Sequence, residues 1–270
     1  MNNFFTEQKT PLLLVSSLIL TIVICLSWWI FTLKSDPLSP TTQVYTPQVY
    51  IDALKKAEQV SSDNISRGLT AIVKDNSQIQ WQGDRLKVAT FTNHQYEVGS
   101  TEPQSRELWV TVVPELQNFC HNYAITGQEV IPRIVQLLGL PPSDRRTQQV
   151  VEFWVDYRDL FRPTPDPEIS DHEAQLAFPE SRNFLTVSAQ YKDWFNNRVR
   201  EFEAQLQEMN PSRMPAPWTR LGYTYDWGES KDHIGLSEFV LVKGADIEVI
   251  SATPANNYCY ANDAIASSQN

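Results

Sequence analysis

The chain has 270 residues and an ordinary globular composition, with 41% hydrophobic and 20% charged residues, which argues against wholesale disorder. Its formal net charge of −10, from 22 basic and 32 acidic residues, repels polyphosphate and argues against non-specific binding of DNA or RNA. We therefore expect no nucleic-acid partner.

The first expected element is a membrane anchor at residues 12–33, which follows a short head at residues 1–11. The run has 22 residues and no charge. As a helix it would be about 33 Å long, enough to cross a hydrocarbon core of about 30 Å. The alternative is a cleaved signal peptide, but its apolar region spans only about 7–15 residues and ends at a small-residue cleavage site. We predict an uncleaved, single-pass anchor.

The orientation of the anchor rests on weaker signals. Lys9 and Lys34 balance one another across the span, so the positive-inside rule does not decide. A short head more often stays in the cytoplasm while the long domain is exported. Cys120 and Cys259 then indicate one disulfide, as in exported domains, the alternative being two unrelated buried thiols. We expect the globular domain on the non-cytoplasmic side of a membrane.

Residues 34–46 are rich in Pro, Ser and Thr, and we expect them to be a spacer. A helix is predicted to begin at Pro47, with Thr46 as its N-cap. Three β-like segments separated by turn-like residues then predict an antiparallel meander, at residues 69–73, 78–81 and 86–92.

In the expected pattern strands outnumber helices and cluster at both ends of the domain. Helices are predicted at residues 129–139, ended by Gly139, and at 188–209, where one face is apolar. Strands are predicted at residues 108–113, 150–157, 218–228, 237–243 and 246–253, of which 150–157 is a nearly continuous apolar run typical of a central strand. The fold class expected is α+β, with a mostly antiparallel sheet and packed helices. A single domain would span residues 47–262, followed by a flexible tail at 263–270.

Residues 161–176 contain three prolines and several side chains that can bind a cation or move a proton. These side chains are Asp166, Glu168, Asp171, His172 and Glu173. An EF-hand loop starting at Asp166 fails, because its Gly and Glu positions are Asp171 and Ala177. Three interpretations remain. The favoured one is a rigid, solvated loop; the others are a divalent-cation site at Asp166, Glu168 and Asp171, and proton chemistry at Asp166, Asp171 or His172. No cofactor is expected, although a divalent cation is possible.

Aromatic side chains flank a few charged ones in residues 217–241. Such groups hold sugars, peptides and ring-bearing ligands. The candidate ligand-binding residues are Trp218, Arg220, Tyr223, Tyr225, Asp226 and Trp227, and Glu238 is a further catalytic candidate. The alternative is ordinary aromatic packing on a twisted sheet.

Two classes of function remain open. The first is a membrane-tethered module that binds an envelope protein or a small ligand. The second is an envelope hydrolase or transferase that uses the carboxylate cluster beside an aromatic-lined cleft. The lack of a nucleophile motif favours the first, since Phe239 replaces the second Gly of Gly-x-Ser-x-Gly. The enzyme hypothesis would gain if Asp226 or Glu238 lay near Asp166 or Asp171 in one pocket.

Overall fold

The structure is a computed structural model that describes residues 47–124, 129–142, 148–180, 187–209, 214–228 and 231–260. The predicted head, anchor and spacer, and the predicted tail, lie outside these residues. No described helix has both the length and the apolar composition needed to span a bilayer.

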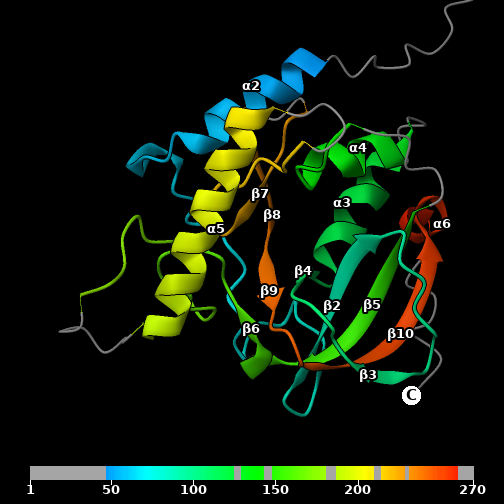
Figure 1. The fold of residues 1–270 in the computed structure, drawn as a ribbon. Helices are drawn as coiled ribbons and strands as arrows, with labels where there is room; N and C mark the ends of the chain where they lie inside the picture. The colour runs from blue at the N-terminus through cyan, green and yellow to red at the C-terminus, as the bar shows by residue number, and fades with distance from the viewer. Residues whose placement is uncertain are drawn as a thin grey trace, which may run out of the picture. The chain divides into compact units, whose positions relative to one another are not determined.

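The described residues form a mixed α+β fold around an antiparallel sheet (Figure 1). The strands lie in the order β3-β10-β5-β2-β4-β9-β6, and β1 pairs with β2 beside this path. Their bounds are β1 Trp81–Gln82, β2 Arg85–Thr92, β3 Thr101–Pro103, β4 Leu108–Val112, β5 Gln149–Asp156, β6 Leu160–Phe161, β9 Phe239–Leu241 and β10 Asp246–Pro254. A separate pair joins β7 (Tyr223–Tyr225) to β8 (Ile234–Ser237).

Strand β5 is central, as its apolar sequence predicts. It pairs with β2 from Arg85 opposite Asp156 to Thr92 opposite Gln149, and with β10 along its other edge. Its side chains are buried at Val150, Val151, Phe153 and Val155. A strand covered on both faces needs apolar residues on both, which explains the unbroken run.

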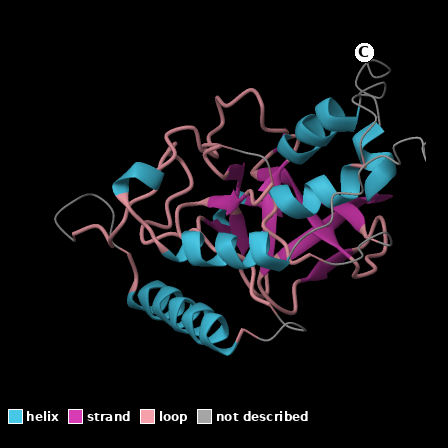
Figure 2. Cartoon of the chain, turned by 90° about the horizontal axis from the view of Figure 1, so that it is seen from above, coloured by secondary structure: helices cyan, strands magenta, loops and turns pink. Residues whose placement is uncertain are grey.

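Helices lie on more than one side of the strands (Figure 2). Their bounds are α2 Pro47–Glu58, α3 Glu115–Ala124, α4 Val130–Leu137, α5 Ala189–Glu208 and α6 Ala255–Tyr260. Short 3-10 turns occur at Ser62–Asn64 and Tyr157–Asp159. Ser188 caps α5 by accepting a hydrogen bond from the backbone N–H of Tyr191 at 3.2 Å. Gly139 follows α4 with φ +63°, a conformation that favours glycine and ends the helix.

A disulfide between Cys120 on α3 and Cys259 on α6 confirms the predicted pairing. The two Cα atoms are 5.1 Å apart, and both side chains are fully buried. They lie in a cluster with apolar residues of α3, α4 and α6. The bond therefore ties the last described helix to a helix 139 residues earlier in the chain.

Part of the expected meander is wrong. The strand predicted at 86–92 is β2, but of the strand predicted at 78–81 only Trp81 is in a strand, β1, and residues 69–73 form no strand. Instead the backbone N–H of Leu69 donates to the carbonyl of His172 at 3.0 Å, and that of Ile72 to Ile169 at 2.7 Å. The partner is the irregular, proline-containing segment, which offers no regular ladder. Helices α3 and α6 and the short strands β3, β6 and β8 were not predicted either.

Candidate functional site

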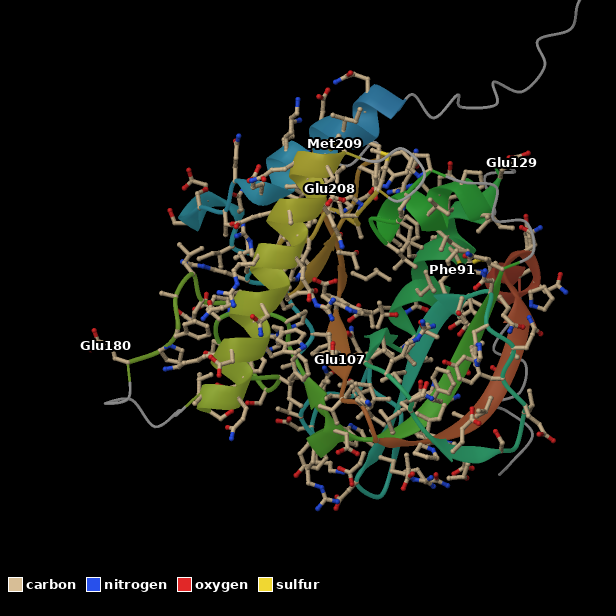
Figure 3. The ribbon with its side chains drawn as sticks, in the orientation of Figure 1. Phe91, Glu107, Glu129, Glu180, Glu208 and Met209 are labelled. Atoms are coloured by element: carbon tan, nitrogen blue, oxygen red, sulfur yellow. A yellow bond between two sulfur atoms is a disulfide. The ribbon has the colours of Figure 1, made fainter. Side chains whose placement is uncertain are left out.

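A cavity of about 370 Å³ lies between the sheet and α5. Its floor is formed by β2 and β4, and its sides by α5 and the segment 215–218. Aromatic side chains supply much of the wall, namely Phe91, Trp109, Phe202, Trp218 and Tyr225. Figure 3 labels Phe91, at the end of β2 beside α3. The indoles of Trp109 and Trp218 meet edge to face, with centroids 6.2 Å apart.

Three polar side-chain atoms at this wall are buried and have no hydrogen-bond partner among the described residues. They are Oε1 of Glu238, Nε1 of Trp218 and Oγ1 of Thr111. The exposed fractions of these residues are only 7%, 7% and 6%. Buried polar atoms are normally paired, and an unpaired one typically costs about 1–3 kcal/mol. All three atoms belong to residues that line the one cavity.

Glu238 occupies the short connection between β8 and β9. Its backbone N–H donates to the carbonyl of Gly222 at 3.0 Å, which fixes the main chain. The neighbouring Phe239 is fully buried in the main core, as alternation along the strand requires. Glu238 itself is one of the residues that line the cavity. Burial raises its pKa well above the usual range.

Helix α5 contributes the polar part of the lining. Arg198, Glu201 and Gln205 recur at helical spacing and line the cavity. The guanidinium of Arg198 donates to Glu107 at 2.8 Å and to Glu201 at 3.2 Å. Glu107, labelled in Figure 3, also accepts a hydrogen bond from the indole N–H of Trp194 at 2.7 Å. Glu107 therefore links α5 to the start of β4.

The structure divides the candidate ligand-binding residues into two groups. Trp218 and Tyr225 line the cavity together with the catalytic candidate Glu238. The others make internal contacts. Arg220 donates to the carbonyl of Glu58, Tyr223 to that of Asn64, Trp227 to that of Leu140, and Asp226 accepts from Arg133.

The Asp226 carboxylate and the Arg133 guanidinium form a bidentate pair, with one N–H···O distance of 2.8 Å. The side chain of Asp226 is 2% exposed. Asp226 therefore holds α4 against the residues after β7, and its oxygens are engaged.

The carboxylates predicted as a metal site do come together. One oxygen each from Asp166, Glu168 and Asp171 lies within 4.8 Å of the other two, so the cluster could hold a cation. Asp171, however, accepts a hydrogen bond from the buried guanidinium of Arg162. His172 is engaged as well, with Nδ1 2.8 Å from the carbonyl of Leu69. None of these residues is among those that line the Glu238 cavity.

The expectation of a solvated loop is wrong for residues 162–166, which are all buried. Arg162 donates to the carbonyls of Thr70, Asp171 and Glu173. The hydroxyl of Tyr191 donates to the carbonyls at 162 and 164. The acidic segment thus wraps a buried arginine, and hydrogen bonds to that arginine hold it in place.

The sequence identified only Trp218, Tyr225 and Glu238 among the lining residues. Those that it missed include Phe91, Trp109, Thr111 and Phe202. Phe91, Trp109 and Thr111 belong to predicted strands and Phe202 to a predicted helix, where such residues indicate core packing. A helix and two strands must be placed in space before these residues are seen to leave a cavity between them.

Glu115, also missed, is the second carboxyl with a raised pKa near this region. It accepts hydrogen bonds from the hydroxyl of Thr70 and, at 3.2 Å, from the backbone N–H of Ser237. Burial outweighs these contacts and raises its pKa to about 7. Its neighbour Leu116 lines the cavity.

Comparison of the chain with family models, with curated proteins and with solved structures finds no match.

Proposed function

We propose that the described domain is a binding module that holds a small, mainly apolar ligand in the Glu238 cavity. The observation that carries this proposal is an apolar cavity whose lining residues include three with buried, unpaired polar atoms, namely Glu238, Trp218 and Thr111. A ligand with a polar head and an apolar body would satisfy those atoms and fill the space between them.

The size and lining of the cavity support this class of ligand. Pockets for small molecules span about 300–1,000 Å³ and are mostly apolar, with a few convergent polar groups. The cavity of about 370 Å³ falls at the lower end of that range. Its aromatic walls suit a flat or chain-like body.

The enzyme hypothesis receives less support. It would gain from a second carboxylate of the acidic cluster near Glu238, because acid and base roles are usually shared between groups. Asp166 and Asp171 do not line the cavity, and Asp226 is paired with Arg133. Glu201 does line it but is engaged with Arg198. Binding is therefore the better conclusion.

The location proposed for the module is the non-cytoplasmic side of a membrane, with residues 12–33 as anchor. The uncharged run and the Cys120–Cys259 disulfide support it, because such bonds persist in oxidising compartments. Single cysteines introduced into the tail should be accessible to thiol reagents from the non-cytoplasmic side of the membrane. A cytoplasmic tail, or a mature N-terminus beyond residue 25, would contradict the proposal.

Binding itself can be tested with a neutral probe, 2-(2-naphthyl)ethanol. The full chain in lipid nanodiscs, titrated calorimetrically with empty nanodiscs as blank, should bind it saturably at one site. Ala216 is exposed and lines the cavity, so Ala216→Trp should obstruct the site and weaken binding at least tenfold. Ala177→Trp, at an exposed position away from the lining, is the matched control. Equal binding by both variants would refute the cavity as the site.

A further inference from the structure

We infer that the ligand of this cavity is an organic monocation, a protonated amine on an apolar body, whose ammonium group pairs with the carboxylate of Glu238. This inference rests on the proposed binding function and assigns the ligand its chemical class.

The charges at the wall disfavour an anionic ligand. Arg198 is the one basic residue among the described lining residues. Its guanidinium is already engaged by Glu107 and Glu201. A carboxylate or phosphate ligand would enter beside Glu238 and Glu201 without a free cation to meet it. The net charge of −10 for the chain adds attraction for cations.

Glu238 lacks a hydrogen-bond donor for one of its oxygens, and an ammonium group would supply one. Its Oε1 is buried without a donor among the residues that the structure describes. An ammonium brings both N–H donors and the opposite charge. The attraction between the two charges is strong in apolar surroundings, which is the condition for offsetting the desolvation of both ions. A neutral alcohol would supply a hydrogen bond but no charge.

The aromatic wall favours the same head group. Ammonium ions are attracted to the faces of Trp, Tyr and Phe within about 6 Å, and the attraction is larger where water is excluded. Trp109, Trp218 and Tyr225 lie on the wall that also carries Glu238. A carboxylate surrounded by rings is a suitable environment for an apolar amine.

Two further buried polar atoms, on Trp218 and Thr111, narrow the chemical class of the ligand. The indole N–H of Trp218 can only donate, and the hydroxyl of Thr111 can donate or accept. Both are buried and unpaired among the described residues. They call for an acceptor oxygen on the ligand, so the geometry suits apolar amino alcohols or amino-carbonyl compounds better than simple alkylamines.

Proton release gives the inference a direct signature. Burial raises the pKa of Glu238 and so favours its protonated form, whereas pairing with an ammonium favours the ionised form. Amine binding should therefore lower this pKa and release protons. The other titratable groups nearby are Arg198, Glu201 and Tyr225 on the lining, Tyr223 on β7, and Glu115, which contacts Ser237. Because Glu115 also has a pKa of about 7, proton counts should be repeated in Glu115→Gln.

The test compares three probes that share one body: 2-(2-naphthyl)ethylamine, 2-(2-naphthyl)ethanol and 2-naphthylacetate. Each is titrated into the full chain in nanodiscs, in two buffers of different ionisation enthalpy. We expect the amine to bind at least tenfold more tightly than the alcohol, and more tightly still relative to the acid. Its binding should release protons, as the buffer dependence of the heat will show. Glu238→Gln should remove the preference for the amine and the proton release while retaining the alcohol. Glu152→Gln, which changes a buried glutamate outside the lining, should keep both.

The outcomes separate the inference from the proposed function. If the alcohol or the acid binds as tightly as the amine, or no proton is released, the ligand is not a cation and the inference fails, while the binding function stands. If none of the three probes binds saturably, both fail. Proton release in the unaltered chain keeps the test decisive even if Glu238→Gln does not fold.

Discussion

The guanidinium of Arg162 donates a hydrogen bond to the carboxylate of Asp171 from a position with no solvent exposure. This contact explains the acidic segment that follows β6. Arg162 must be paired because an isolated buried cation is unfavourable. The neighbouring carbonyls and Asp171 provide that pairing, and the segment is folded around it. The position of Asp171 therefore has a structural explanation that does not involve a ligand.

Removing the Asp171 charge should destabilise the protein. Asp171→Asn leaves the Arg162 charge buried without its anion, and we expect a loss of about 2–3 kcal/mol, moderated because the carboxylate is one-third exposed. Urea unfolding would measure it. Asp84→Asn removes a carboxylate that is 61% exposed and should leave the midpoint close to that of the parent chain. Equal midpoints for the two variants would show that the Arg162 contact does not stabilise the fold.

Calcium should have little effect on stability. The Asp171 oxygen is already held by Arg162, and Ca²⁺ needs about six or more oxygen ligands in a closed shell. We expect millimolar Ca²⁺ to leave the melting temperature within a degree. An ion present at a concentration 100 times its dissociation constant would add about 2.7 kcal/mol to the free energy of unfolding, which a melting curve would detect. A rise of several degrees that Asp166→Asn abolishes would make the cluster a metal site.

Glu115 should make stability fall as the pH rises. Its pKa of about 7 in the folded protein exceeds the ordinary 4.5, so the folded state binds more protons between those values. Stability attributable to Glu115 is then complete below pH 4.5 and is lost as the pH rises through 7. The loss is on the order of 3 kcal/mol, since one pKa unit corresponds to about 1.4 kcal/mol.

Urea midpoints measured from pH 4.5 to pH 8 would reveal this dependence. Glu115→Gln should be more stable than the parent at pH 8 and similar to it near pH 4.5. Glu97→Gln, at an exposed position, should follow the parent at every pH. A parallel dependence in all three chains would assign the effect to other groups.

The disulfide should contribute strongly to stability. It closes a loop with a sequence separation of 139, and the chain-entropy model gives about 4–5 kcal/mol for a loop of that size. Replacing Cys120 and Cys259 together by Ser should lower the free energy of unfolding by that order. The chain has three cysteines, so the unreduced, denatured protein should label only at Cys25. Labelling of all three cysteines would show that Cys120 and Cys259 are not bonded to each other.

Local patterns in the sequence predict much of this fold. The apolar run of β5, the amphipathic face of α5 and the Gly139 stop each follow from short-range physics, and each lies where expected. The errors involve long-range partners. Residues 69–73 have a strand-like composition, but their backbone partners lie about a hundred residues later, in an irregular segment. No local pattern carries that information.

For the candidate site, too, local patterns predict some residues correctly, and the errors involve long-range partners. The aromatic segment pointed to Trp218, Tyr225 and Glu238, and these do line the cavity. The same segment also pointed to Asp226, whose partner Arg133 lies 93 residues earlier. Whether an acidic residue is paired or free depends on such distant partners, and composition cannot distinguish the two cases.

Glu238 itself should lower the stability of the free protein. An unpaired carboxyl in an apolar cavity is costly, and replacing such a group by an apolar one of similar length removes the penalty. We expect Glu238→Met to raise the free energy of unfolding of the free protein by about 1–3 kcal/mol. The gain should be larger at pH 8 than at pH 4.5, because burial raises the pKa of Glu238 and its ionisation opposes folding.

The matched change is Glu152→Met. Glu152 is also buried, but it accepts from the hydroxyl of Tyr258 at 3.0 Å and pairs with Lys87 at 3.6 Å. Its loss leaves those partners unsatisfied, so this variant should be less stable than the parent. In urea unfolding, Glu238→Met should raise the free energy of unfolding and Glu152→Met should lower it. Opposite changes would show that Glu238 lowers the stability of the free protein, as functional residues often do. If Glu238→Met destabilises as Glu152→Met does, Glu238 has a structural partner, and neither its role in the cavity nor the inferred amine pairing can stand.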